Sequence, residues 1–499
     1  MRSMLQHSSA PQVHRAPGRS LHVKGAEPHR RRRLLATVLV AAIALTVALA
    51  AIFASSAHAA VPAAVNIVGP GHYARIQEAV NASSPGGWVL IEPGVYDESV
   101  RVTTPDLHIR GMSRNAVIID GQGLSVPGGR NGIEVYKADD VWIENLTVRN
   151  FERESQNGAN GNAIWWNGGS GSGQIGARGW WGRYLTAYDT GLDGGYGIFT
   201  SNETEGSFED VYASGFNDSG IYVGACRDCY ARIANAIVED NAVGYSGSNA
   251  GGHLIIERSL FRHNSAGIVP NSENPGDPPP PQDGACSSGE NSSPTPTFST
   301  TRIARCTIIR YNAVVENNNL STPANDSTLK APWGVGVELP GTYADLITRN
   351  LIAGNASDGV LGFEYPNPFP PTAETIFFQL AGNRISENLF FGNGTGGEPF
   401  SGDVTLAGGL FGQQLSTNNC VSYNLMPDPT FPEAIEGTWG CQNETTPNPS
   451  PGNLEPVGYL LALQEASESR RSVPQPPPPP QPTMPDPCAG VPANPLCRR

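Results

Sequence analysis

Two carboxylates, Asp189 and Asp193, flank Gly191 in a short glycine-rich stretch. A pair of carboxylic acids can hydrolyse a glycosidic bond when one protonates the leaving oxygen and the other activates water or attacks the sugar. Carboxylate oxygens can also hold a calcium ion. We therefore take Asp189 and Asp193 as the candidate catalytic pair, with calcium as the candidate cofactor. Further carboxylates share this part of the chain: Glu134, Glu203, Asp218, Asp228, Glu239, Asp240 and Glu338.

A lyase would need a base beside the acidic sugar, and two cations are placed for that role. Lys137 follows the segment that contains Glu134, and Arg227 follows Tyr222. Ordinary surface cations are the commoner explanation for such residues. Lyase and glycoside hydrolase chemistry therefore both stay open, and Arg227 is kept as a candidate substrate contact.

Aromatic residues recur at matching places in the chain. Phe199 and Tyr222 each stand two residues after a glycine that opens an apolar segment, and Trp165 fits the same place by a looser alignment. Aromatic rings can stack on the apolar faces of sugars. We take Trp165, Phe199, Tyr222 and Glu134 as candidate substrate-binding residues. The alternative is that loops 168–182 and 191–195 cover these rings as a small satellite core.

The glycines belong to an internal repeat. Gly197, Gly220, Gly244 and Gly267 are separated by 23, 24 and 23 residues, and Gly336 and Gly359 are again 23 apart. A period of this length with short alternating segments predicts a solenoid of stacked coils, because one coil cannot bury its apolar side chains alone. The predicted fold is all-β, a right-handed parallel β-helix.

Asparagines keep the same period. Asn217, Asn241 and Asn264 follow the alternating segments, and Asn312, Asn355 and Asn393 extend the series. We expect these side chains to form a ladder of amide hydrogen bonds from coil to coil. We also expect the asparagines and the strand-opening glycines to adopt left-handed backbone conformations.

The beginning of this region resembles a known group. The segments Ile76-Gln77-Glu78-Ala79-Val80, 89–96 (VLIEPGVY) and Ile118-Ile119-Asp120-Gly121 resemble the pectin-lyase-like superfamily of right-handed parallel β-helices. The resemblance implies the fold. Residues 73–82, with Ile76, Ala79 and Val80 on one face, predict a short amphipathic helix that covers the open end of the first coil. The resemblance leaves the chemistry open, because the superfamily includes lyases, hydrolases, esterases, epimerases, tailspikes and adhesins. The chain has neither the Arg-Pro-Arg cluster of pectate lyases nor the Asp-Pro-His-Asp string of mannuronan epimerases.

The N-terminal 59 residues are typical of an export signal. Four arginines, Arg30 to Arg33, precede an apolar run 34–53 and a small-residue site at Ala57-His58-Ala59. Cleavage there would give a secreted, extracellular protein. The alternative is an uncleaved, outward-facing membrane anchor, since the run is long enough to span a bilayer.

Charge limits the partners. The residues after 59 hold 24 basic and 45 acidic side chains, a formal charge of −21. A body this acidic repels phosphate backbones, so we expect no nucleic-acid partner. We expect the membrane to be contacted only through an uncleaved N-terminal segment, and a polysaccharide or cell-wall glycan to be the partner.

All eight cysteines lie in the exported part, which favours disulfides. Pairing between nearest neighbours is the simplest arrangement: Cys226 with Cys229, Cys286 with Cys306, Cys420 with Cys441, and Cys488 with Cys497.

The predicted organisation is a signal (1–59), a β-helix (60–400) with an irregular insertion (271–300), a C-terminal cap region (401–471), and a proline-rich tail with a cysteine loop (472–499). Two functions remain: a secreted protein that binds a polysaccharide, with or without cleaving it, or a non-catalytic adhesin or scaffold with the tail as a spacer.

Overall fold

The structure is a computed structural model, in which one compact unit spans Ala63–Arg499. The predicted signal (1–59) and most of the predicted insertion lie outside the described residues. No helix in the described part of the chain is long and apolar enough to cross a membrane. The described residues are 64–122, 130–153, 160–169, 174–226, 228–272, 306–324, 332–366, 377–398, 400–407, 416–441 and 472–497.

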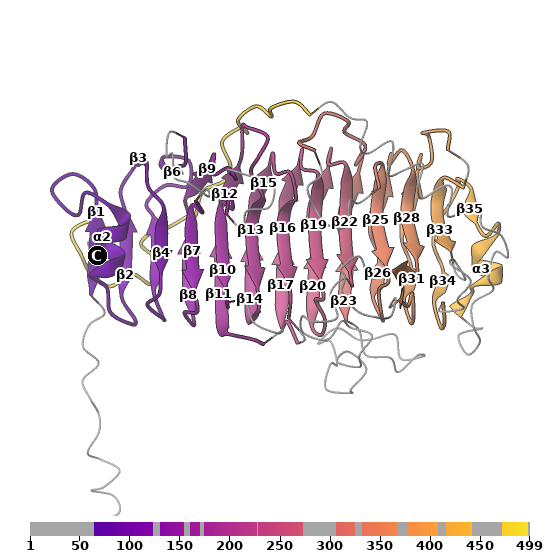
Figure 1. Cartoon of the computed structure of the whole chain (residues 1–499), viewed down its shortest axis with the longest axis horizontal. Coiled ribbons are helices and arrows are strands. Elements are labelled where there is room, and N and C mark those ends of the chain that lie inside the picture. The colour runs from indigo at the N-terminus through magenta and orange to yellow at the C-terminus, as the bar shows by residue number, and fades with distance from the viewer. Residues whose placement is uncertain are drawn as a thin grey trace, which may run out of the picture. The chain divides into compact units, whose positions relative to one another are not determined.

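The described strands form three long parallel sheets that wind around a common axis, which confirms the right-handed parallel β-helix (Figure 1). Sheet A has 12 strands: β1 (Val65–Val68), β2 (Trp88–Ile91), β5 (His108–Gly111), β8 (Val141–Glu144), β11 (Ala177–Arg183), β14 (Glu203–Glu209), β17 (Ala231–Ala234), β20 (Leu254–Glu257), β23 (Thr307–Arg310), β26 (Leu346–Thr348), β31 (Arg384–Ser386) and β34 (Cys420–Ser422).

Sheet B, the next in each coil, has 10 strands: β3 (Gly94–Tyr96), β6 (Val117–Asp120), β9 (Thr147–Arg149), β12 (Thr186–Tyr188), β15 (Tyr212–Ser214), β18 (Ile237–Glu239), β21 (Leu260–Arg262), β24 (Ala313–Val315), β27 (Leu351–Ala353) and β32 (Leu389–Phe391). Sheet C completes the coil with 11 strands: β4 (Val100–Val102), β7 (Ile133–Tyr136), β10 (Ile164–Asn167), β13 (Tyr196–Ser201), β16 (Ser219–Gly224), β19 (Val243–Ser248), β22 (Ala266–Asn271), β25 (Val335–Pro340), β28 (Asp358–Phe363), β33 (Gly402–Ala407) and β35 (Thr430–Phe431). A small antiparallel pair, β29 (Tyr365–Pro366) and β30 (Phe377–Phe378), stands apart.

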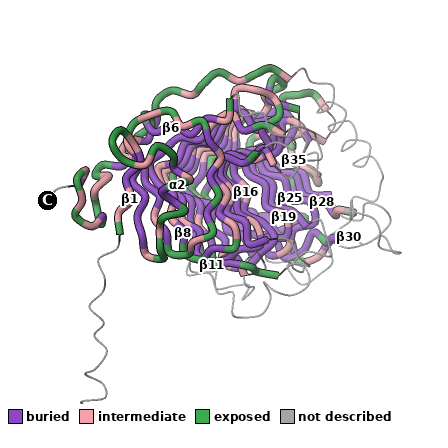
Figure 2. Tube along the Cα trace, turned by 60° about the vertical axis from the view of Figure 1, so that its left-hand side comes forward, coloured by how far each residue is buried: buried purple, intermediate pink, exposed green. Residues whose placement is uncertain are grey.

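The core runs along the inside of the coils. On sheet C, Ile198 pairs with Ile221, Ile221 with Tyr245, and Tyr245 with Ile268, so one inward position repeats along the axis. All four side chains are buried in one continuous cluster, and Figure 2 shows buried residues throughout the stacked coils. The sequence repeat therefore corresponds to the structural coil.

Both ends of the solenoid are covered. Helix α2 (Ile76–Asn81) buries Ile76, Ala79 and Val80 against the first coil, and its first N–H groups donate to the carboxylate of Glu98. At the other end, β33 and β34 continue sheets C and A beyond residue 400, where the pattern in the sequence fades. Helix α3 (Ile435–Thr438) then buries Ile435 at that end.

The asparagine ladder begins at Asn241. Its amide donates to Asn264 Oδ1 (3.0 Å), and the series continues through Asn317, Asn355 and Asn393 at 3.0 to 3.2 Å. Two expected members lie elsewhere: Asn217 donates to the Leu192 carbonyl, and Asn312 belongs to a second ladder with Asn350, Asn388 and Asn424.

The backbone prediction at these turns was wrong. The left-handed residue precedes each ladder asparagine, as at Asp240 and His263, because the asparagine itself turns inward to bond the next coil. The strand-opening glycines also avoid positive φ. They are required by close approach: a Cβ at Gly244 would lie 2.6 Å from the carbonyl oxygen of Gly267.

Disulfides join Cys226 to Cys229, Cys420 to Cys441, and Cys488 to Cys497, each between nearest neighbours. Cys306 is also disulfide-bonded, whereas Cys286 lies outside the described residues.

The proline-rich tail is docked on the solenoid rather than extended as a spacer. Gln475 Nε2 donates to the Ser321 carbonyl (2.8 Å), and Asn145 Oδ1 accepts from the Met484 N–H (2.9 Å). Nearer the end, Arg110 pairs with Glu144 (2.6 Å) and donates to the Ala489 carbonyl (2.7 Å). The tail therefore runs back along the solenoid to the N-terminal coils.

Candidate binding surface

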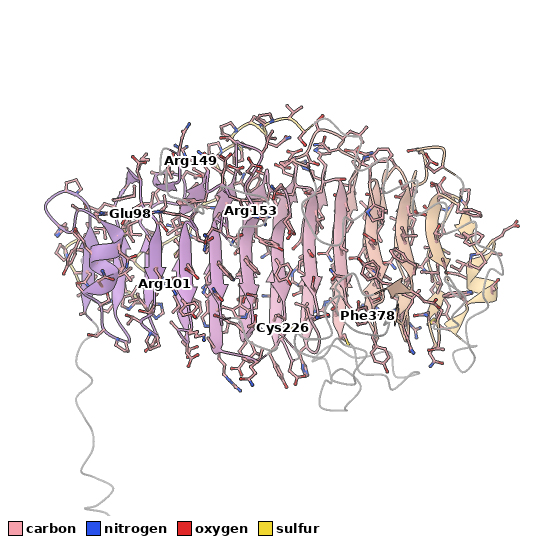
Figure 3. All side chains as sticks on the ribbon, in the orientation of Figure 1. Glu98, Arg101, Arg149, Arg153, Cys226 and Phe378 are labelled. Carbon is pink, nitrogen blue, oxygen red and sulfur yellow. A yellow bond between two sulfur atoms is a disulfide. The ribbon has the colours of Figure 1, made fainter. Side chains whose placement is uncertain are left out.

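One outward position of sheet C carries most of the residues that the sequence analysis selected. Glu134 pairs with Trp165, Trp165 with Phe199, and Phe199 with Tyr222 on adjacent strands. Parallel strands lie about 4.8 Å apart, so these side chains form one column along the axis. We call this column and its neighbours the sheet C surface. Figure 3 labels Arg101 and Arg153, which border it.

The aromatic rings of this column pack on one another. Trp165 and Phe199 are stacked with centroids 5.0 Å apart and planes 5° apart, whereas Tyr222 meets Phe199 edge-on at 4.9 Å. Tyr196 closes the cluster by stacking on Phe199 at 4.4 Å. No sugar can insert between rings this close, so a ligand could meet only ring edges and the Trp165 face toward Glu134. Trp165 and Tyr222 are partly exposed, and Phe199 is buried.

Polar groups hold the start of the column. Glu134 accepts a hydrogen bond from Asn167 Nδ2 (2.9 Å) and forms an ion pair with Arg101 (3.2 Å). The Trp165 indole N–H donates to Ser201 Oγ (3.2 Å). These bonds fix the side chains in place before any ligand arrives. Pre-ordered polar groups beside an apolar ring are the usual composition of a binding site.

The second half of the same sheet face is covered. Val243, Ala266 and Val269 pack beneath Tyr365, and Leu361 and Phe363 form an adjoining cluster. Glu338, which follows Val269 in the column, is buried there, and burial raises its pKa well above the ordinary value. Among the described strands, the partly exposed rings of the column are therefore those of β10 and β16, with Tyr196 of β13 beside them.

The predicted catalytic pair is divided between the interior and the surface. Asp189 is only 1% exposed and accepts the Gly194 N–H at Oδ2 (3.1 Å), whereas Asp193 is exposed. Burial, reinforced by the nearby Glu152 charge, raises the pKa of Asp189 to about 7. The Asp189 carboxyl thus has the protonation behaviour of a general acid, but it lies beneath the 190–195 loop.

Glu152 is the acid that the sequence analysis missed. Burial and the charge of Asp193 raise its pKa. A Cβ on Gly191 would lie 1.4 Å from Glu152 Oε1, so the glycine is needed for the carboxylate to sit against the loop. Glu152 is 37 residues before Asp189, and nothing in their sequence spacing indicated that they meet.

Tyr196 was also missed. Burial and a hydrogen-bonded Asp218 raise the pKa of its hydroxyl, and the Arg153 guanidinium lies 5.8 Å from its ring centre. Tyr196 directly precedes Gly197, so the repeat itself could have pointed to it as an outward neighbour of the column.

Two of the other candidate carboxylates, Glu203 and Glu239, are buried within the fold. Glu239 is bound by Arg262 (2.6 Å) and by the Tyr212 hydroxyl (2.7 Å), as expected of a structural ion pair. Glu203 is buried with no hydrogen-bond partner on either carboxylate oxygen, and burial raises its pKa. Arg227 lies outside the described residues. Within the described ranges, no three His, Cys, Asp or Glu side chains are grouped to hold a metal ion.

A second aromatic ladder lies on the outer face of sheet A. Trp88, His108, Trp142 and Trp181 stack in order, with centroids 4.1, 5.8 and 5.0 Å apart and planes within 18° of parallel. Trp88 is covered by Val491 and Cys497 of the tail. This ladder could not be predicted from the repeat, because its members are 20, 34 and 39 residues apart and fall outside the glycine period.

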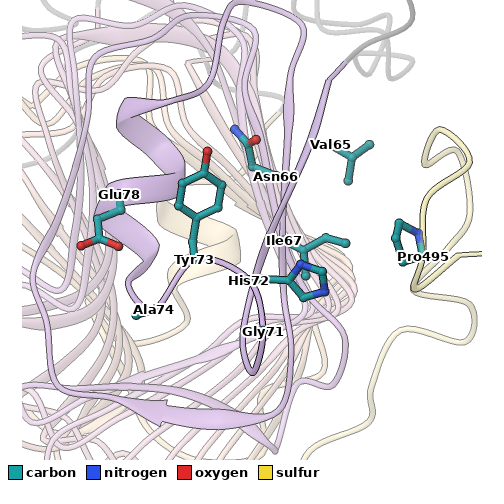
Figure 4. A pocket seen from close by; sticks show the side chains of 9 residues that line it. All are labelled: Val65, Asn66, Ile67, Gly71, His72, Tyr73, Ala74, Glu78 and Pro495. Atoms are coloured by element: carbon teal, nitrogen blue, oxygen red, sulfur yellow. The ribbon is translucent and has the colours of Figure 1, made fainter.

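A pocket of about 620 Å³ lies at the N-terminal end of the solenoid, and neither Asp189 nor Glu152 lines it. Figure 4 shows His72, Tyr73 and Glu78 along its wall, with Pro495 of the tail opposite Val65 and Ile67. None of the predicted site residues lines it.

The chain has a right-handed parallel β-helix fold. No family model matches it, and no curated protein matches its sequence. Among solved structures, it is similar to the A-module of mannuronan C-5 epimerase AlgE4 from Azotobacter vinelandii, at 12% identity and TM-score 0.41, over 70% of this chain and 89% of that one. It is also similar to pectin methylesterase PemA from Erwinia chrysanthemi, at 15% identity and TM-score 0.36, over 78% and 99% of the two chains. An alginate lyase from Paenibacillus is 13% identical, with TM-score 0.32, over 63% and 94%. Likenesses this distant concern the fold and leave the activity open.

Proposed function

We propose that this protein is exported and binds a polysaccharide along the sheet C surface. The observation that carries the proposal is the run of partly exposed rings, Trp165 to Tyr222, beside the fixed polar groups of Glu134, Asn167 and Ser201. Ring edges and one indole face offer apolar contact to sugar C–H groups, and the polar groups offer hydrogen bonds to hydroxyls.

An uncharged glycan fits the electrostatics best. Glu134 and Arg101 form an ion pair at the start of the column, so their charges neutralise each other. The nearby cation Lys137 packs against an aromatic ring, with its Nζ 5.4 Å from the centre of Tyr136. The body as a whole is strongly acidic. An anionic polymer would therefore be repelled unless cations bridged the two. If calcium took part, Asp189 and Asp193 would be its candidate ligands.

Cleavage is the second candidate function, and Asp189 favours it. A carboxyl with a pKa of about 7 is partly protonated at neutral pH, as a general acid must be. Catalysis through Asp189 requires the 190–195 loop to open, since the side chain is otherwise enclosed. A non-catalytic adhesin remains the rival, although the docked tail removes the spacer from that hypothesis.

Binding and cleavage can be separated in one assay. The purified protein is incubated with neutral glucans and mannans, pectins and alginate, while binding, reducing ends and the absorbance of unsaturated products are followed. We expect binding to a neutral polymer. Binding without products on every substrate would refute the cleavage function, and no binding to any polymer would refute the proposal itself.

A further inference from the structure

The outer face of sheet B carries an exposed apolar stripe near the C-terminal end. Leu351, Leu389, Phe391 and Leu425 are 38%, 38%, 46% and 56% exposed. Leu351 pairs with Leu389, and Leu389 forms a bridge with Leu425, so three leucines stand on successive coils. We call these four residues the sheet B stripe. Contiguous exposed apolar surface of this kind marks an interaction site.

The described parts of the same chain bracket the stripe. Cys441 is bonded to Cys420 in β34, the last strand of sheet A, at the C-terminal end. The chain is next described at the tail, where the Val473 N–H donates to the carbonyl of Ser321, which follows β24 (3.2 Å). The stripe lies between Ser321 and Cys441, on the three coils that contain β27, β32 and Leu425.

The intervening sequence has both the length and the composition to cover this surface. The coils from β24 to Leu425 span about 15 Å at the usual strand spacing. Thirty residues, 442–471, connect the two points and could span roughly 100 Å if extended. Within them, apolar residues are concentrated in ten positions before a polar run: Leu454, Val457, Leu460, Leu461 and Leu463.

We propose that residues 454–463 dock on the sheet B stripe. Burying leucines from both sides removes apolar surface from water, and the segment is already tethered at both ends, so little further ordering is needed for it to dock. The chain after β34 then forms one continuous strap: the apolar segment covers the sheet B stripe, and the tail continues to the N-terminal coils. This surface is separate from the sheet C surface, so the inference does not depend on glycan binding.

Hydrogen exchange measured by mass spectrometry on the full-length monomer tests this inference. We expect the amides of 454–463 to exchange at least tenfold more slowly than an unstructured peptide of the same sequence. The double variant Leu389→Ser/Leu425→Ser should remove that protection. The matched control is Val95→Ser, at an equally exposed valine of β3, which should leave it unchanged.

Three results would overturn the proposal. Rapid exchange of 454–463 in the wild type would show that the segment is undocked. Protection that persists in the double variant would place the segment elsewhere. Protection that appears only as the protein dimerises with concentration would assign the stripe to a second copy. Glycan binding should be the same in all variants, which separates this outcome from a failure of the proposed function.

Discussion

The aromatic ladders of sheet A and sheet C use similar ring stacking in two different surroundings. On sheet A, all four rings are nearly parallel, and the tail covers the ladder at Trp88. On sheet C, the parallel stacking ends after Phe199, because Tyr222 packs edge-on against it. Beside these rings, Glu134 accepts a hydrogen bond from Asn167, and Ser201 accepts one from the Trp165 indole. Stacked rings by themselves stabilise a solenoid. Ring edges framed by polar groups form a surface that a ligand can contact.

The acidic groups sharpen this contrast. Glu152, Asp189 and Asp193 gather beside the sheet C ladder, at the loop that leads into β13. The sheet A ladder has instead Arg110 over Trp88, at 4.8 Å from the ring centre, paired with Glu144. We therefore expect changes at sheet A to affect stability, and changes at sheet C to affect binding and its pH dependence.

Removal of the tail, residues 472–499, should have the largest effect. It uncovers Trp88 and takes carbonyl acceptors from the buried side chains of Arg110 and Arg114. Hydrogen bonds to charged groups contribute about 1.5 to 3 kcal/mol each, so with the loss of apolar packing on Trp88 we expect a loss of about 4 kcal/mol in the free energy of unfolding. Denaturant melts measure it, and glycan binding by the folded truncated protein should be unchanged. Loss of binding with intact stability would reverse the roles of the two ladders.

The Asp189→Asn variant should change the pH dependence of stability. The folded carboxyl titrates near pH 7 and the unfolded one near pH 4, so the folded state holds the extra proton between these values. Wild-type stability should therefore fall as the pH rises from 4 to 7, by up to about 4 kcal/mol. Asparagine can still accept the Gly194 N–H, and its variant should lack this fall. An identical pH profile in both proteins would show that Asp189 is ionised in the fold.

Replacement of Trp142 by alanine tests the structural ladder. Trp142 stacks between His108 and Trp181 and is partly buried, so we expect a loss of about 2 kcal/mol of stability. Isothermal titration with the glycan identified in the panel should show unchanged affinity. Weakened binding in a stable variant would make sheet A a second binding surface.

Replacement of Trp165 by alanine is the matched test on sheet C. We expect at least a tenfold loss of glycan affinity, about 1.4 kcal/mol, and a comparable loss for Tyr222→Ala. Stability should fall less than in the Trp142 variant, because among the described residues Trp165 stacks on one ring, Phe199, whereas Trp142 stacks on two. Unchanged affinity in both sheet C variants would move the binding site away from Trp165 and Tyr222.

Much of the fold was predictable from local pattern. The glycine period, the alternating apolar residues and the amphipathic segment at Ile76 each depend on neighbours in sequence, so they predicted the coil, its inward column and the cap. The alignment of Glu134, Trp165, Phe199 and Tyr222 followed from the same period, because strands in register place equal repeat positions side by side.

The sequence by itself therefore determined a β-helix with an outward aromatic column and cysteines spaced for local disulfides. Only the tertiary structure decided which acids meet, since Glu152 reaches Asp189 across neighbouring coils whose lengths vary with their loops. It also decided that rings of the column stack on each other, and that a proline-rich tail returns to the first coils. Side-chain orientation and long-range docking depend on what surrounds each group, and a one-dimensional repeat does not encode that.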